Sequence, residues 1–345
     1  KTSHLEKTPF YAESGGQIAD TGVFELEGEL LCQVVDVQKN GNEIIHFCNK
    51  QKDFPDIKGL GDSINTKIDT DRRNSIRLNH TSTHLLHSAL KNVVGEHVQQ
   101  AGSLVSDEKL RFDLTHYEKI QADQIKQIED SVNQIIRENI SLETNLESFE
   151  SAKENGALAL FGEKYEDEVR VVNIPGFSKE LCGGTHVKQT GDIGAFKIVS
   201  ESSLSTGVRR IEAVTGNAYI DFMNKKIELL NELKDVLNCS EGEIADKVES
   251  ILFDNKKLES QFNSSQQQNN QKIFKEILSN INLEKEFNLI VERIDGVSDL
   301  RNLGDIFKDK INKKGILVIG SIVNDKPTIM ASVTDDLLDN IDAIS

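Results

Sequence analysis

The sequence contains no tryptophan, only four cysteines and no long apolar run, and each shortage argues against a class of protein. A membrane-spanning helix needs roughly 20 predominantly apolar residues, and no stretch of this chain approaches that length, so we expect no membrane protein. Four cysteines in 345 residues do not make a disulfide framework. With 28% charged residues, the composition is typical of a soluble intracellular protein, which we expect to be cytoplasmic.

The start of the chain lacks an initiator methionine and a signal peptide. Residues 1–7 (KTSHLEK) have no apolar core of the kind that secretion requires, and we expect a piece of a longer protein. The formal net charge of -17 argues against a non-specific nucleic-acid binder, which needs a basic surface to displace phosphate counterions. The charge of a local site can nevertheless have the opposite sign, so a protein that recognises one end of an RNA stays compatible with this composition.

The length suits two or three folded units, and the sequence pattern changes along it. We expect a β-rich subdomain over residues 1–72, in which apolar stretches at 30–37 and 43–47 flank an Asn-Gly turn. Residues 73–216 follow as a core, with helices expected at 71–95 and 123–136 and strands at 169–174 and 195–200. Strands and helices are mixed without a regular repeat, so the predicted fold class is α+β.

Two further units are expected after residue 216. Residues 217–285 carry an apolar stripe on a long charged helix that ends near Asn238, and Ser240 and Glu243 then form a capping box for a second helix. The break favours an antiparallel helical hairpin over a parallel dimerising coil, because a coil needs a sustained heptad. Residues 286–345 contain short apolar runs at 288–291, 315–319 and 328–333, which predict a small α/β domain that we expect to be cut short inside a helix.

Two histidines four residues apart, His80 and His84, lie in the first predicted helix. Positions i and i+4 share one helical face, so both imidazoles can reach one metal ion. Zinc proteases use the same spacing, but they carry a glutamate directly after the first histidine as the general base. Here that position is Thr81, which excludes a protease. Such a pair can also be a solvated helix face, and the nearby His87 is assigned no role.

A second pair, Cys182 and His186, has the same spacing about a hundred residues later. Gly183 and Gly184 lie between them and let the chain fold back, so that thiolate and imidazole converge. One cysteine and three histidines satisfy tetrahedral zinc, and the thiolate favours zinc over magnesium or calcium. We therefore predict one Zn²⁺ site formed by His80, His84, Cys182 and His186. The remaining cysteines are expected to be packing or surface residues, namely Cys32, Cys48 and Cys239.

The number of ligands leaves the role of the metal open. Four protein ligands would complete a structural site, whereas three ligands and a water molecule would give a Lewis acid with an activated nucleophile. Displacement of Cys182 would convert one arrangement into the other, so Cys182 is a candidate catalytic residue as well as a ligand. A thiol nucleophile with His186 as its base is a less favoured alternative, because a zinc-bound thiolate is a poor free nucleophile.

Several segments of the sequence resemble the editing region of alanyl-tRNA synthetases. They are residues 8–17 (TPFYAESGGQ), 79–87 (NHTSTHLLH), 97–103 (HVQQAGS), 110–113 (LRFD), 159–165 (ALFGEKY), 181–186 (LCGGTH), 190–194 (TGDIG) and 207–214 (GVRRIEAV). The resemblance is strong over residues 1–216 and continues weakly through the helical hairpin into the C-terminal domain, which these enzymes share with a family of phosphoesterases. It indicates a C-terminal fragment of such a synthetase, without the domain that activates alanine.

The resemblance implies hydrolysis of Ser-tRNA and Gly-tRNA wrongly made on the alanine tRNA, with the acceptor end of that tRNA as the partner. It implies that the four predicted ligands bind zinc and that Gln100 lies beside the scissile ester, where its amide can bond the ester or a water molecule. Substrate contacts are expected from Gly15, Gly16 and Gln17, because a glycine pair lets backbone approach a ligand closely, with a plain turn as the alternative for the pair. Arg209 and Arg210 are candidates to contact tRNA phosphates, with a structural ion pair as the alternative.

Other interpretations stay open. A free-standing relative that edits in trans would have the same motifs, and only the complete gene would distinguish it. A tRNA-binding and dimerising module would hold a purely structural zinc, and a homodimer through the C-terminal region is a further expectation. A threonine-type editing domain shares a similar ligand pattern, but the long helical hairpin and the appended α/β domain fit the alanine enzyme better.

Overall fold

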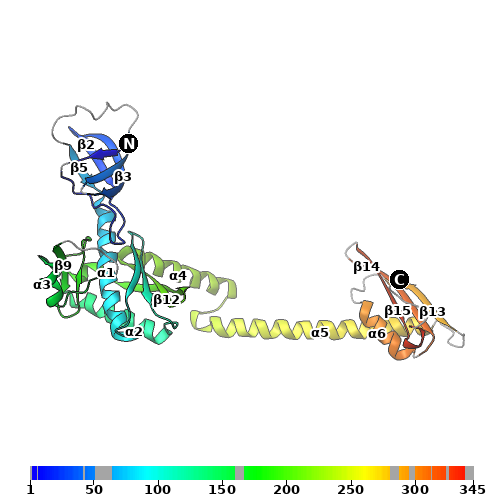
Figure 1. Ribbon diagram of the computed structural model, residues 1–345. Helices are drawn as coiled ribbons and strands as arrows, with labels where there is room; N and C mark the ends of the chain where they lie inside the picture. Colours follow the sequence, from blue (N-terminus) through cyan, green and yellow to red (C-terminus); the bar gives the residue numbers. More distant parts are fainter. Residues whose placement is uncertain are drawn as a thin grey trace. The chain divides into compact units, whose positions relative to one another are not determined.

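The computed structural model describes residues 2–5, 7–41, 43–50, 64–159, 167–279, 287–294, 300–311, 313–323 and 326–338 (Figure 1). The chain divides into two compact units, Lys1–Leu229 and Leu230–Ser345. Small sheets and helices are mixed along the chain, which confirms the predicted α+β class. The domain boundaries at residues 72, 216 and 285 stay predictions. Within the described ranges, no helix has the length and apolar character needed to cross a membrane.

The N-terminal sheet contains five antiparallel strands in the order β1-β4-β3-β2-β5. They are β1 (Thr2–His4), β2 (Gly22–Leu26), β3 (Glu29–Asn40), β4 (Glu43–Lys50) and β5 (Asn65–Ile68). Strands β3 and β4 form the predicted hairpin, and Gly41 in its turn has a φ of 59°, which glycine adopts without strain. The core of this sheet buries Cys32 and Cys48, so both serve as packing residues there.

A four-stranded antiparallel sheet with the order β11-β12-β7-β6 lies further along the first unit. Its strands are β6 (Gln100–Val105), β7 (Leu110–Thr115), β11 (Phe196–Ser205) and β12 (Val208–Thr215). Helix α2 (Ala122–Glu138) contacts β11, and both elements lie where the sequence predicts them. Strands β6, β7 and β12 are not predicted, because small residues in β6 and charged residues in β7 and β12 obscure the apolar alternation of a strand.

A three-stranded antiparallel sheet with the order β10-β9-β8 leads into the loop that contains the second pair of predicted ligands. It consists of β8 (Glu143–Ser148), β9 (Glu168–Ile174) and β10 (Ser178–Leu181), and α3 (Phe149–Glu154) contacts β8 and β9. Strand β9 confirms the strand predicted at 169–174. The chain runs from β10 directly into Cys182, and the short 3-10 helix η1 (Thr190–Ile193) follows.

Helix α1 (Thr70–Val94) is central to the first unit (Figure 1). Its N-cap Asp69 accepts a hydrogen bond from the Arg72 amide, and Gly95 ends it, close to the predicted bounds. The helix contacts α2, β10 and the strands β6, β7 and β12, so polar as well as apolar side chains between Asn79 and Leu90 are buried. Buried polar groups need hydrogen-bond partners or a metal ion, and this stretch contains both histidines of the first predicted pair.

Two long helices follow, as predicted: α4 (Gly216–Leu237) and α5 (Ile244–Ser279). Asn238 interrupts them with a φ of 49°. The Glu243 carboxylate accepts a hydrogen bond from the Ser240 amide at the short helix η2 (Glu241–Glu243), which confirms the predicted capping box. The antiparallel packing of α4 against α5 stays a prediction.

The second unit contains the small α/β domain that the sequence predicts. Its elements are β13 (Asn288–Arg293), α6 (Leu300–Lys310), β14 (Gly315–Val323), β15 (Lys326–Val333) and the short helix η3 (Asp335–Leu337). Strand β14 pairs with β13 in parallel and with β15 antiparallel. The end of α5 packs with α6 and the sheet in one apolar core. The helix predicted at the chain end falls in residues 339–345, outside the described residues.

Candidate metal centre

Four side chains that the sequence groups by spacing meet at one point of the first unit. His80, His84, Cys182 and His186 each offer one ligand atom, and these atoms lie within 4.8 Å of one another. The Cys182 Sγ atom is 3.3 Å from His80 Nε2 and 3.2 Å from His186 Nε2. The imidazoles of His80 and His84 are stacked with ring centroids 5.4 Å apart, because both project from the same face of α1. The structure therefore brings all four predicted ligands together.

The loop after β10 approaches α1 closely because glycine occupies position 184. A Cβ on Gly184 would overlap the His80 imidazole, whereas a Cβ on Gly183 would meet no atom within 4 Å. Arg170 on β9 donates hydrogen bonds from Nη1 to the carbonyl oxygens of Cys182 and Gly184, at 2.9 and 2.7 Å. Gly184 thus permits the approach, and Arg170 holds the loop in it.

Each histidine of the cluster has a hydrogen-bond partner at Nδ1, which leaves Nε2 toward the other ligands. The three contacts are His80 Nδ1 to Gln17 Oε1 at 2.6 Å, His84 Nδ1 to Glu180 Oε2 at 2.6 Å, and His186 Nδ1 to Thr81 Oγ1 at 3.2 Å. Partners of this kind fix the tautomer and orientation of metal-ligating histidines. His84 Nε2 is buried without a hydrogen-bond partner among the described residues, an arrangement that costs roughly 1–3 kcal/mol and that a metal ion would relieve. The residues present therefore fit zinc.

The charges in the cluster favour a thiolate. Burial raises the pKa of the Cys182 thiol, but the imidazoles of His80, His186 and His84 outweigh it and hold that pKa well below its usual range. Burial lowers the pKa of His84, yet the charges of Glu180 and Cys182 outweigh it and raise the value to about 10. Burial lowers the pKa of His186 to about 3. Without metal, the cluster therefore holds a proton on His84, which a metal ion would have to displace.

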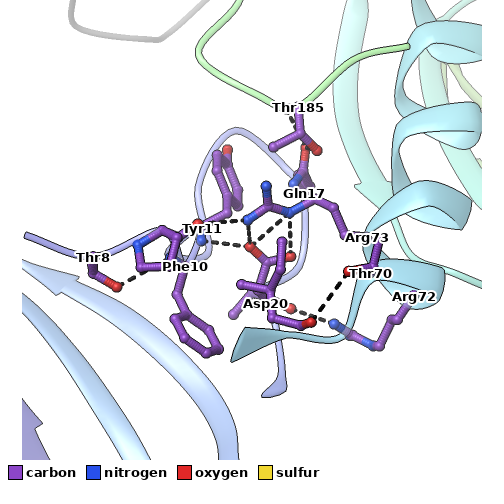
Figure 2. A network of polar contacts seen from close by, with 12 residues as sticks. Thr8, Phe10, Tyr11, Gln17, Asp20, Thr70, Arg72, Arg73 and Thr185 are labelled. Atoms are coloured by element: carbon purple, nitrogen blue, oxygen red, sulfur yellow. Dashed lines mark hydrogen bonds and ion pairs between the residues drawn. The ribbon is translucent and has the colours of Figure 1, made fainter. Parts of the chain in front are cut away.

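Gln17 connects the N-terminal segment to the metal centre. Its Oε1 atom accepts hydrogen bonds from the Thr185 amide at 2.9 Å and the Thr185 hydroxyl at 3.2 Å (Figure 2). The same oxygen atom contacts His80 Nδ1. The loop that carries Gln17 is fixed to α1 by a buried ion pair between Asp20 and Arg73 (Figure 2). The structure thus gives Gln17 a contact that positions a predicted ligand, and its contact with substrate stays a prediction.

A small cavity of about 80 Å³ opens onto the cluster. Its lining includes Gly15, Gln100 at the start of β6, and three of the predicted ligands. Gly16 instead lies against β6: its φ is 81°, and a Cβ there would overlap the carbonyl of Ser103. Gln100 and Gly15 therefore line the same cavity as three of the predicted ligands, while substrate contacts of Gly15, Gly16 and Gln100 stay predictions. Most of the motif at residues 159–165 lies outside the described residues.

Both arginines proposed for tRNA are paired with carboxylates. Arg209 contacts Glu201 at 2.6 Å, and the side chains of this pair are largely buried. Arg210 makes two parallel hydrogen bonds to Asp113 on β7, at 2.7 and 2.8 Å. Neighbouring residues of a strand point to opposite faces, so the two guanidinium groups do not form one patch. These ion pairs match the structural alternative, and phosphate contact stays a prediction.

Glu180 and His87 are parts of the site that the sequence does not reveal. Glu180 is 2% exposed, and its two oxygens accept from different histidines, His84 and His87. His87 is assigned no role from the sequence, yet it is buried and contributes to this network. One signal for Glu180 was available in the sequence. It lies two residues before Cys182, and side chains two residues apart on a strand point to the same face.

Comparison with protein families defines the class of this chain. Residues 169–212, which contain Cys182 and His186, match the family model described as threonyl and alanyl tRNA synthetase second additional domain. Residues 4–72, which contain Gln17, match the model described as tRNA synthetases class II (A). The chain thus carries segments of aminoacyl-tRNA synthetases.

The individual relatives are alanine–tRNA ligases. The chain is 42% identical to the alanine–tRNA ligase of Legionella pneumophila (strain Lens) over 339 residues, which is 97% of this chain and 38% of that protein. It is also 42% identical to the enzyme of Pseudoalteromonas translucida (strain TAC 125) over 341 residues, 98% of this chain and 39% of that protein. The chain is therefore homologous to alanine–tRNA ligases along nearly its whole length, and it spans about two fifths of the length of these curated relatives.

Proposed function

We propose that this chain hydrolyses the ester bond of Ser-tRNA(Ala) and Gly-tRNA(Ala), as the editing part of an alanine–tRNA ligase. The observation that supports this most strongly is the convergence of His80, His84, Cys182 and His186 beside a cavity that Gln100 also lines. The match of residues 169–212 to a domain of threonyl and alanyl tRNA synthetases supports the same class of substrate.

Ester hydrolysis of this kind is needed because a single binding pocket cannot separate alanine sufficiently from serine and glycine. Serine adds a hydroxyl group to alanine and glycine lacks a methyl group, and one pocket discriminates against such differences by only ~1–3 kcal/mol. A second, hydrolytic site supplies the missing discrimination. The small cavity of about 80 Å³ suits a short amino-acid side chain at the reacting ester.

The roles of the residues follow from their contacts. The three imidazoles and the Cys182 thiolate would hold the ion, and Gln17, Glu180 and Thr81 orient the imidazoles through Nδ1. When water or the substrate displaces Cys182, the ion would have an open position and would supply a Lewis acid worth several kcal/mol to a reaction that develops negative charge. Gln100 lines the cavity from the side of β6, where its amide can donate a hydrogen bond to the ester carbonyl.

The direct test is release of serine from Ser-tRNA(Ala) by the purified chain. Cys182→Ala removes a ligand and should lower both zinc content and the hydrolysis rate, the latter at least about 1,000-fold, since several kcal/mol of stabilisation are lost. Cys239→Ala is the matched control, because Cys239 lies at the break between α4 and α5 and outside the cluster. Full activity of the Cys182 variant would contradict the proposal.

A structural zinc in a tRNA-binding module is the second candidate. The observation in its favour is that four protein donors, the number that closes a tetrahedral site, lie within reach of one ion. This candidate predicts tRNA binding without ester hydrolysis. Gln100→Ala separates the two, because it should slow hydrolysis in the editing enzyme while leaving zinc content and tRNA binding unchanged.

Partners are also part of the proposal. The acceptor end of the alanine tRNA is the expected partner of the first unit, in the cytoplasm. A homodimer through the second unit is supported by four apolar side chains of α5 that are each more than 60% exposed, namely Leu252, Phe253, Leu258 and Phe262. Sedimentation equilibrium of the chain and of a Phe253→Ser, Phe262→Ser variant tests this: the variant should be monomeric at concentrations where the parent chain dimerises.

A further inference from the structure

His87 occupies a buried position one helical turn after His84 on α1. Its Nδ1 atom is 3.1 Å from Glu180 Oε1, and the Ser178 hydroxyl donates to the same oxygen at 3.2 Å. The other carboxylate oxygen, Oε2, is 2.6 Å from His84 Nδ1. Glu180 therefore divides its two oxygens between a predicted metal ligand and a histidine outside the ligand set.

This division restricts the Glu180 carboxylate. A carboxylate bonded only to His84 could rotate about its terminal torsion, which is broad for glutamate, and the imidazole would follow it. Donors from His87 and Ser178 hold Oε1, so that only Oε2 is presented to His84. The direction of His84 Nε2, which is the predicted ligand atom, is thereby set in part by a residue outside the ligand set.

The His87 ring is itself fixed by its surroundings. It is 6% exposed, and its centroid is 5.4 Å from that of Phe112 on β7. A buried histidine is often a satisfied core residue, but His87 Nε2 has no hydrogen-bond partner among the described residues. Burial of an imidazole with one nitrogen unpaired is unfavourable for a core position alone. The arrangement is better explained by the hydrogen bond that His87 Nδ1 makes to Glu180 Oε1.

We propose that His87 is a positioning residue for the metal centre, which acts through Glu180 to orient the His84 imidazole toward the ion. The inference rests on the proposed zinc-dependent function. Groups bonded directly to a metal ligand, as Glu180 is to His84, typically change metal affinity by about 10–100-fold when removed, and His87 acts one contact further out, so we expect the lower end of that range. His87 should therefore contribute to metal affinity and to the geometry of the ion without contacting it.

The test compares three substitutions in the full chain. His87→Leu removes the donor at similar volume and should weaken zinc binding by about 10-fold, measured by competition with a chelator. His87→Asn places an amide N–H where Nδ1 lies and should restore affinity to within about threefold of the parent chain. Leu90→Ala weakens the core on the same helix without touching Glu180, so it controls for simple loss of stability.

Cobalt provides a readout that a purely structural role would not change. The visible absorption of the Co²⁺-loaded chain reports the ligand geometry, and it should shift for His87→Leu but not for His87→Asn or Leu90→Ala. In hydrolysis assays, His87→Leu should lower kcat and leave KM unchanged, because substrate contacts are intact. Parent-like affinity and spectrum for His87→Leu would overturn the inference, as would an equal loss in Leu90→Ala. A parent chain that binds metal but hydrolyses no ester would instead overturn only the proposed function.

Discussion

Helices α1 and α6 are both covered by other elements, but they bury opposite kinds of side chain. The buried residues of α6 are apolar or glycine: Leu300, Leu303, Gly304 and Phe307. Helix α1 buries an unbroken polar run within its apolar neighbours, namely Asn79, His80, Thr81, Ser82, Thr83 and His84. Removing polar groups from water is unfavourable unless each is paired, so a helix selected for stability alone would resemble α6. The polar interior of α1 therefore marks the part of the molecule where chemistry, rather than packing, determines the sequence.

The largest effect is expected from a pair of variants, Gly184→Ala and Gly183→Ala, which test whether the polar interior of α1 forms a metal site with the cysteine loop. A methyl group at position 184 would overlap the His80 imidazole, whereas at 183 it would meet open space. We expect Gly184→Ala to lose bound metal and at least about 1,000-fold in ester hydrolysis, because the several kcal/mol supplied by the metal are lost. Gly183→Ala should retain both properties. Zinc analysis together with the serine-release assay gives the result, and equal behaviour of the two variants would contradict the site geometry.

The next largest effect is expected at the ion pair that fixes the Gln17 loop to α1. Asp20→Ala leaves Arg73 buried with the Pro9 carbonyl as its remaining acceptor among the described residues. We expect the free energy of unfolding to fall by about 3 kcal/mol, as for other broken buried pairs. Hydrogen exchange of the α1 amides measures this locally. Asp130→Asn is the control, because Lys126 and Asp130 form an exposed pair on α2 that is worth at most about 0.5 kcal/mol.

Metal affinity should depend on pH through His84. Its pKa is raised to about 10, so the metal-free chain holds a proton there at neutral pH, and binding must release it. Affinity should therefore rise about tenfold per pH unit between about pH 6 and 9 and level off above about 10. His186 adds nothing in this range, since its pKa is lowered to about 3. Chelator competition at several pH values tests the slope, and Glu180→Gln should flatten it.

The smallest effect is expected in the apolar core of the second unit. Ile319 on β14 is fully buried in the core that also contains Phe307 of α6. Ile319→Val removes one methylene group and should cost about 1 kcal/mol in the local stability of β14, measured by hydrogen exchange. Zinc content and ester hydrolysis should be unchanged. A change in either would show that the two units are energetically coupled.

The ligand set could be predicted from the sequence because each pair is local. His80 and His84 are related by helical geometry, and Cys182 and His186 by a short glycine loop, so spacing alone indicates convergence within each pair. The long helices α1, α2, α4 and α5, the hairpin of β3 and β4, and the strands of the small C-terminal domain were predictable for the same reason. Apolar periodicity and turn residues are properties of neighbouring positions.

The residues that orient the metal ligands could not be predicted, because each lies far in the sequence from the residue that it contacts. His87 and Glu180 are separated by 93 residues, and Gln17 and Thr185 by 168. Their pairing depends on how β10 and the N-terminal loop pack against α1, and no local pattern encodes that packing. The ion pairs of Arg209 and Arg210 could not be predicted for a similar reason, since Glu201 and Asp113 are brought near them only by strand register.

The single oxygen of Gln17 that serves both His80 and Thr185 limits how this centre could be transplanted. An engineer who grafts only the helix and the cysteine loop onto a new scaffold would leave an imidazole nitrogen and a loop amide facing each other with no acceptor between them. The smallest portable version of the centre must therefore include residues 8–20 and the Arg73 side chain of the helix, with which Asp20 pairs.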